Sequence, residues 1–133
     1  MAFFRTTKQL YVVVEQLFFR IMEEDARAGE AMASSRMLVH MQTTEPEGLI
    51  VINGRVQPVR FLFGVNESSP DLQVTLSGDA LHQILLGELG LRQAMSLKQL
   101  QVKGPIFKMM LLLPLFQHTQ RIYPTILREQ GLR

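Results

Sequence analysis

The residues that could carry out chemistry are few and widely separated. His40, His82 and His118 belong to no His-x-x-x-His or Glu-x-x-His pattern, the spacings that bring two metal ligands onto one helix face. Ser34-Ser35 and Ser68-Ser69 lack the Gly-x-Ser-x-Gly turn that exposes a serine nucleophile. The chain also has no cysteine, which excludes a thiolate nucleophile, a disulfide and a thiolate zinc site. We therefore expect no catalytic residue, no metal site and no cofactor, and we predict that the protein is not an enzyme.

The formal charge of +2 conceals a basic C-terminal third. Residues 1–91 hold seven Lys/Arg and eleven Asp/Glu, a net −4, whereas residues 92–133 hold seven Lys/Arg and only Glu129, a net +6. Such a surface suits an anionic membrane, although a solvated face is the simpler interpretation. Nucleic-acid binding would require exposed aromatic residues among the cations. We expect Phe107 and Phe116 to be buried and therefore predict no nucleic-acid partner.

Composition and length indicate one globular domain. The chain has 133 residues, of which 47% are hydrophobic and 20% charged. Its most apolar run, 109–116, is far shorter than the ~20 residues that span a bilayer. No secretory signal is recognisable at residues 1–20, because Glu15 and Arg20 interrupt the apolar residues there. These features, with the absence of cysteine, predict a cytoplasmic protein.

Two helices are indicated by capping residues and apolar spacing. Thr6 with Gln9 is a capping box, and an apolar stripe follows at helical spacing, which predicts a helix over about 7–28 that ends at Gly29. Ser77 can cap a second helix, with Asp79 in its first turn. Gly87 or Gly90 would end that helix, and a short helical turn is expected over 92–97.

Alternating apolar residues predict five strands. They lie over residues 37–42, 49–52, 59–65, 72–76 and 100–103. Asn53-Gly54 predicts a tight hairpin between the second and the third of these, because both residues tolerate positive φ.

A third helix is predicted after Gly104-Pro105, since proline is tolerated at the first helical position. Over residues 106–116 only Lys108 carries a polar side chain, so this helix must be buried on every side or face something apolar. A final helix over about 117–129, disturbed by Pro124, would cover part of it. The surplus of apolar surface is typical of a pocket for an apolar ligand.

A spaced pattern over residues 72–104 resembles the C-terminal half of the type-2 sterol carrier protein domain family. The pattern has an alternating strand at 72–76, an acidic helix start at 78–81 and a Leu-rich helix ending in glycine at 84–87. A small-then-bulky pair at 94–95 and a strand that closes on glycine at 100–104 complete it. The upstream order of helix, strands and hairpin is also similar.

The sequence departs from the family pattern at three places. Lys98-Gln99 stand where the family often has Gly-Lys, and Leu111–Leu113 replace polar residues of the family's final helix. The segment after Phe116 extends beyond the usual family core.

The resemblance implies an α+β fold with a five-stranded, mostly antiparallel sheet that is covered by helices and encloses an apolar tunnel. We expect a single domain over 1–133, with a core of about 7–116 and a helical extension at 117–133. The implied function is non-catalytic binding or transfer of a fatty acyl, sterol-like or isoprenoid lipid. The predicted ligand-binding residues are Leu81, Leu85, Val102, Ile106, Met109, Met110 and Leu113.

Two further roles remain open at this point. The apolar helix is alternatively buried in a homodimer or against a lipid-metabolising enzyme, because exposed apolar patches mark such interfaces. The basic C-terminal third is a candidate for transient docking on an anionic membrane surface, where cargo would be loaded or released.

Overall fold

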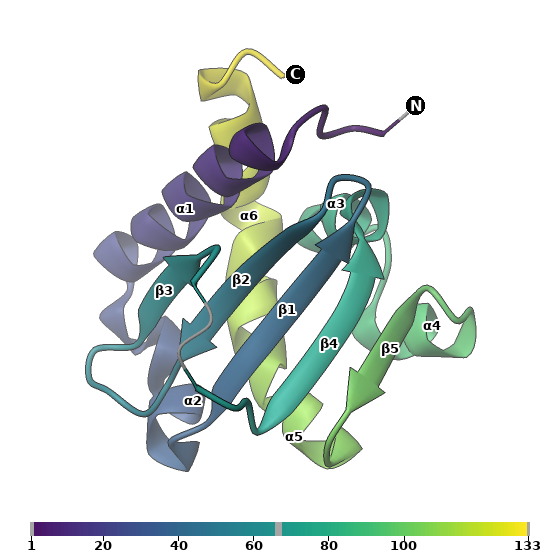
Figure 1. Ribbon diagram of the computed structural model, residues 1–133. Helices are drawn as coiled ribbons and strands as arrows, with labels where there is room; N and C mark the ends of the chain where they lie inside the picture. Colours follow the sequence, from purple (N-terminus) through teal and green to yellow (C-terminus); the bar gives the residue numbers. More distant parts are fainter. Residues whose placement is uncertain (1, 66–67, 133) are drawn as a thin grey trace.

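The helices of the molecule lie on one face of a single sheet (Figure 1). The computed structural model describes residues 2–65 and 68–132. The strand order is β3-β2-β1-β4-β5; β1–β4 is a parallel pair, and the other three pairs are antiparallel. The predicted five-stranded, mostly antiparallel α+β fold is therefore confirmed. The strands are β1 Leu38–Thr44, β2 Gly48–Asn53, β3 Arg60–Phe63, β4 Leu72–Ser77 and β5 Leu100–Lys103.

The helical segments differ greatly in length. The two long helices, α1 and α6, lie side by side behind the sheet, and shorter segments cover its other end (Figure 1). The helical segments are α1 Thr7–Glu24, η1 Ala26–Gly29, α2 Glu30–Ser35, α3 Gly78–Leu86, α4 Leu91–Ser96, α5 Ile106–Met109, η2 Met110–Leu112 and α6 Leu113–Glu129.

The predicted caps of α1 and α3 are present. The Thr6 side chain accepts a hydrogen bond from the Gln9 backbone N–H (3.0 Å), and Ser77 Oγ accepts one from the Ala80 N–H (3.0 Å). Gly87 ends α3 in the left-handed conformation with φ +84°, a conformation that favours glycine. These local signals fix where α1 begins and where α3 lies relative to β4.

The main core lies between the sheet and the helices. Along β4, Leu72, Val74 and Leu76 are buried and alternate with half-buried polar residues, so one face of the strand meets the helices. The described ends of the β3–β4 connection, residues 64–65 and 68–71, lie on the side of the sheet away from the helices (Figure 1). Its described residues Val65 and Ser68 line a hollow together with His40.

The first predicted helix is shorter than expected. It ends at Glu24 rather than near Gly29, because Asp25 adopts an extended conformation and its side chain accepts the Arg27 N–H (3.0 Å). A short polar side chain that bonds to nearby backbone competes with helix continuation in this way.

Asn53-Gly54 does not form the expected tight hairpin. The Gly54 N–H donates to the Met37 carbonyl (2.8 Å), and the Asn53 side chain accepts the Arg55 N–H (2.9 Å). These bonds hold the chain in a longer connection, so β3 begins only at Arg60.

The predicted apolar helix over 106–116 is in fact divided among three segments. A short α5 passes into η2, and α6 begins at Leu113, so the break comes before Pro114. Proline has no N–H to donate and its ring would clash with the carbonyl four residues earlier, but it is tolerated in the first turn of a new helix. Pro124, by contrast, lies inside α6 without ending it, in a stretch whose neighbours Tyr123 and Ile126 are fully buried.

Candidate functional site

A small apolar cavity lies under the shorter helical segments. Its volume is about 10 Å³, which is at the lower limit for a single water molecule. The ten residues around it are all hydrophobic and come from the sheet and from five helical segments. They are Met41, Val74, Leu76, Leu81, Ile84, Leu91, Leu100, Met109, Leu112 and Phe116.

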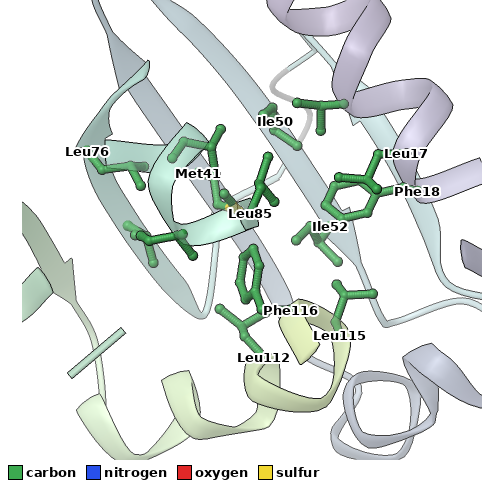
Figure 2. Close-up of a cluster of buried hydrophobic side chains, with 14 of the residues drawn as sticks. Leu17, Phe18, Met41, Ile50, Ile52, Leu76, Leu85, Leu112, Leu115 and Phe116 are labelled. Atoms are coloured by element: carbon green, nitrogen blue, oxygen red, sulfur yellow. The ribbon is translucent and has the colours of Figure 1, made fainter. Parts of the chain in front are cut away.

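Regular spacing in two elements places four of the ten lining residues. In β4, Val74 and Leu76 are two residues apart and therefore share the face that meets the helices. In α3, Leu81 and Ile84 are three residues apart and share one helix face. Figure 2 shows Phe116 pointing from α6 towards Met41 and Leu85, with Leu112 beside it.

The structure brings together two of the seven residues predicted from sequence to bind a ligand. Leu81 and Met109 line the cavity, and Leu85 is fully buried in the adjoining core. Val102, Met110 and Leu113 are half-buried, and Val102 and Leu113 pack against the edge of the core. Ile106 is 55% exposed and lies outside the cavity.

Sequence reasoning missed eight lining residues. Alternation in the fourth and fifth predicted strands could have identified three of them, Val74, Leu76 and Leu100, because they share the face of the sheet that meets the helices. Alternation in the first predicted strand could likewise have identified Met41. No local signal identifies Leu91 or Phe116, since their position depends on how distant segments pack together. The other two are Ile84 and Leu112.

The polar groups near α3 connect elements to one another. His82 Nδ1 lies 2.7 Å from the Tyr123 hydroxyl of α6, and its ring stacks on Phe3 with the ring centroids 3.6 Å apart. Asp79 accepts the Phe3 N–H (2.8 Å), which ties the N-terminal segment to the first turn of α3. Burial raises the pKa of Tyr123 well above its ordinary value, so the hydroxyl stays protonated. The arrangement fixes α3 between the N-terminal segment and α6.

A larger hollow lies on the opposite face of the sheet, next to the one lined by Val65 and Ser68. Its volume is about 440 Å³, and its lining includes His40, Gln42, Ser68, Ser69 and Gln73. His40 is 6% exposed, and no hydrogen-bond partner for its Nε2 exists in the described part of the chain. Burial lowers the pKa of His40, so the ring is held neutral. With its mostly polar lining, this hollow does not suit an apolar chain.

Within the ranges that the structure describes, no three His, Asp or Glu side chains gather as metal ligands would. In the same part of the chain, no helix is both long and apolar enough to cross a bilayer.

Several solved structures with the same fold are sterol carrier proteins. The apo sterol carrier protein 2 of Yarrowia lipolytica aligns with a TM-score of 0.62 at 14% identity, over 80% of this chain and 89% of that one. The sterol carrier protein domain 2 of Helicoverpa armigera aligns with a TM-score of 0.64 at 19% identity, over 80% and 84%. Sterol carrier protein 2 of Aedes aegypti, solved with the C16 fatty acid palmitate, aligns with a TM-score of 0.54 at 16% identity, over 70% and 90%.

A comparison with curated proteins gave no match. The family model of the SCP-2 sterol transfer family matches residues 14–117, which run from the middle of α1 into the start of α6. The match includes both the sheet and all ten residues around the apolar cavity. The chain therefore belongs to the SCP-2 sterol transfer family.

Proposed function

We propose that the protein binds or transfers an apolar lipid, such as a fatty acyl chain or a sterol-like or isoprenoid molecule, and performs no catalysis on it. The observation that carries the proposal is the wholly apolar cavity between β4, β5 and the shorter helices, in a member of a sterol transfer family. Palmitate bound to the similar Aedes aegypti protein supports a fatty acyl chain as one ligand of this fold.

Binding requires the cavity to open, because a lipid chain is far larger than about 10 Å³. The segments that cover it are short: α4 has six residues, α5 has four and η2 has three. Isolated helices of this length are not stable on their own, so their position depends on packing. Outward movement of α5 and η2 would bring half-buried Met110 and Leu113 to the cavity wall together with Val102.

The ligand itself would supply the free energy for this opening. Burial of apolar surface is worth about 25 cal/mol per Å², so a long acyl chain offsets the loss of side-chain contacts made by Met109 and Leu112. Leu81 and Leu85 in α3 would form the fixed wall, since both are fully buried and their helix is capped at both ends.

The experiment combines native mass spectrometry with one pair of variants. A bound mass that extracts into organic solvent as a fatty acid, sterol or isoprenoid would identify the ligand class. Met110→Glu places a charge beside the opened wall and should abolish binding of a fluorescent C16 fatty acid. Leu97→Glu, at a side chain that is 54% exposed, is the matched control and should bind normally. Unchanged binding by a folded Met110→Glu variant would contradict the proposed site.

A second candidate function is an interaction module in which α5 is covered by another protein chain, such as a second copy or a lipid-metabolising enzyme. The specific observation in its favour is the exposure of Ile106 and Phe107. Sedimentation at increasing concentration tests the homodimer: a ligand-free dimer favours self-association, and a lipid-loaded monomer excludes the homodimer.

A further inference from the structure

The most exposed large hydrophobic side chain in the described residues is Phe107, at 74%. Its neighbour Ile106 is 55% exposed, and both belong to the first turn of α5. The expectation that Phe107 is buried is therefore wrong. Met109 occupies the buried position of this four-residue helix, and a residue two positions earlier points to the opposite side. We call Ile106 and Phe107 the α5 tip.

Cations from three parts of the chain lie at the end of the sheet that bears the α5 tip, and the contacts of Asp71 connect these parts. Its carboxylate accepts the Leu38 N–H at the start of β1 (2.9 Å) and pairs with Arg55 at 3.0 Å. The Leu38 hydrogen bond, then Arg55, then Lys108 hold the pKa of Asp71 below its usual value. Lys108 therefore lies within electrostatic reach of this carboxylate.

Two more cations lie at the same end of the sheet. Lys103 is opposite Gln73 in the β4–β5 pairing and is one residue from Gly104. A Cβ at Gly104 would lie 2.7 Å from the Asp71 carbonyl oxygen, so the chain passes directly over Asp71 at this point. Arg36, two residues before Leu38, is exposed. Since Arg55 already neutralises Asp71, the end of the sheet that bears the α5 tip carries an excess of positive charge.

We propose that the α5 tip inserts into the surface of an anionic lipid membrane, with Arg36, Lys103 and Lys108 against the headgroups, and that this insertion opens the apolar cavity. Aromatic and aliphatic side chains bordered by cations are the combination that binds the interface of anionic bilayers. Each Lys or Arg near such a surface contributes about 1 kcal/mol, which corresponds to about a fivefold change in partitioning.

A second copy of the chain fits the α5 tip less well. A symmetric contact would place the cations of one tip against those of the other, and like charges across an interface are unfavourable. The apolar area is also small, because an aromatic side chain buries at most about 250 Å² and a stable interface needs about 800 Å² from each partner.

The α5 tip is directly connected to the cavity. Met109 is two residues from Phe107 and Leu112 is five, and both line the cavity at about 1% exposure. Because α5 has only four residues, a movement of Ile106 and Phe107 deeper into the bilayer would carry Met109 with it. Membrane contact would thus withdraw Met109 and Leu112 from the cavity at the place where lipid is available. This part rests on the proposed lipid-binding function.

The test measures co-sedimentation of the full chain with vesicles made of equal parts phosphatidylcholine and phosphatidylserine, and with vesicles of phosphatidylcholine alone. The protein should bind the anionic vesicles, and added salt should weaken the binding. Phe107→Ser should lower partitioning about tenfold or more. Phe19→Ser, at a side chain on α1 that is 63% exposed, is the matched control and should have no effect. Lys103→Gln should lower partitioning about fivefold.

Equal binding of the Phe107→Ser variant and wild type, or an equal loss with Phe19→Ser, would overturn the proposal. So would a tip-dependent dimer, or a tip-dependent complex with an acidic protein, in the absence of vesicle binding.

A second measurement separates this proposal from the function on which it rests. Phe107→Ser should still bind a fluorescent C16 fatty acid in solution but should take it up from anionic vesicles at least several-fold more slowly than wild type. Failure of the wild type to bind fatty acid, sterol or isoprenoid would reject the lipid-binding function, even if the protein binds to anionic vesicles. Normal fatty-acid binding without vesicle binding would reject the docking alone. Vesicle binding with equal uptake rates would reject the coupling to the cavity.

Discussion

The two halves of the sheet are covered by very different helices. Behind β1, β2 and β3 lie α1 and α6, with 18 and 17 residues, and their side chains Leu17 and Ile126 are completely buried. Behind β4 and β5 lie α3, with nine residues, and the shorter α4, α5 and η2, none longer than six residues. Long helices hold most of their own backbone hydrogen bonds, whereas short ones depend on packing. We therefore expect the half over β4 and β5, where the apolar cavity lies, to open more readily than the other.

The largest expected effect comes from truncating one buried leucine to alanine behind each half of the sheet. Leu17→Ala in α1 should lower the free energy of unfolding by about 4–5 kcal/mol, because the long helices cannot collapse into the space. Leu112→Ala in η2, at an equally buried side chain, should cost about 3 kcal/mol or less, since a three-residue segment can move inward. Urea unfolding measures both. An equal cost for the two variants would break the comparison.

The next effect is visible in the wild-type protein. Backbone amides of α4, α5 and η2 should exchange with deuterium through local opening, well before global unfolding. Amides in the middle of α1 and α6 should exchange only when the whole molecule unfolds. Hydrogen exchange followed by mass spectrometry tests this order, and addition of palmitate should slow exchange in the first group alone. Uniform protection over all five helices would show that neither half opens first.

The smallest expected effect is a pH dependence that arises on the other face of the sheet. Burial lowers the pKa of His40, so the unfolded chain binds a proton at a higher pH than the folded one. Stability should be complete above about pH 6.5 and should decline as the pH falls through the lowered pKa. His40→Gln should remove this decline.

Protonation of Asp71 does not add to the loss of stability that His40 causes in that pH range. Its pKa is lowered from 3.8, so the stability it contributes is lost only at more acidic pH. The difference in free energy between Leu17→Ala and Leu112→Ala should not change between pH 7 and pH 5, because both leucines lie in the core on the helix-covered side of the sheet. Urea unfolding at the two values measures this, and a difference that grows with acid would show that the two faces are coupled.

Much of the fold could be predicted because its signals are local. The alternation of β4, the Ser77 cap and the left-handed Gly87 each involve residues within a few positions of one another. The parallel pairing of β1 with β4 has no such signal, since Leu72 and its partner Val39 are far apart in the chain. Local patterns specify elements, and long-range packing specifies their order in the sheet.

The candidate site was harder to predict for the same reason. The apolar composition of 106–116 predicted a ligand pocket beside this segment, but not the break before Pro114 or the exposure of Phe107. The basic C-terminal third is also divided by the fold. Arg121 lies 3.9 Å from Glu24 of α1, whereas Lys108 acts on Asp71, the ion-pair partner of Arg55 from the β2–β3 connection. A sum of charges along the chain does not show which of them become neighbours.

Gly104 has a consequence for how such a surface could be redesigned. Its φ of +118° and its close approach to the Asp71 carbonyl require glycine, and they set the direction in which the chain leaves β5. Different residues therefore determine where the α5 tip lies and what it binds. Gly104 sets the path of the backbone, and the side chains of residues 106 and 107 set which surface the tip can contact. A designer could exchange Ile106 and Phe107 for polar or acidic side chains and retarget the protein to another surface without disturbing the sheet.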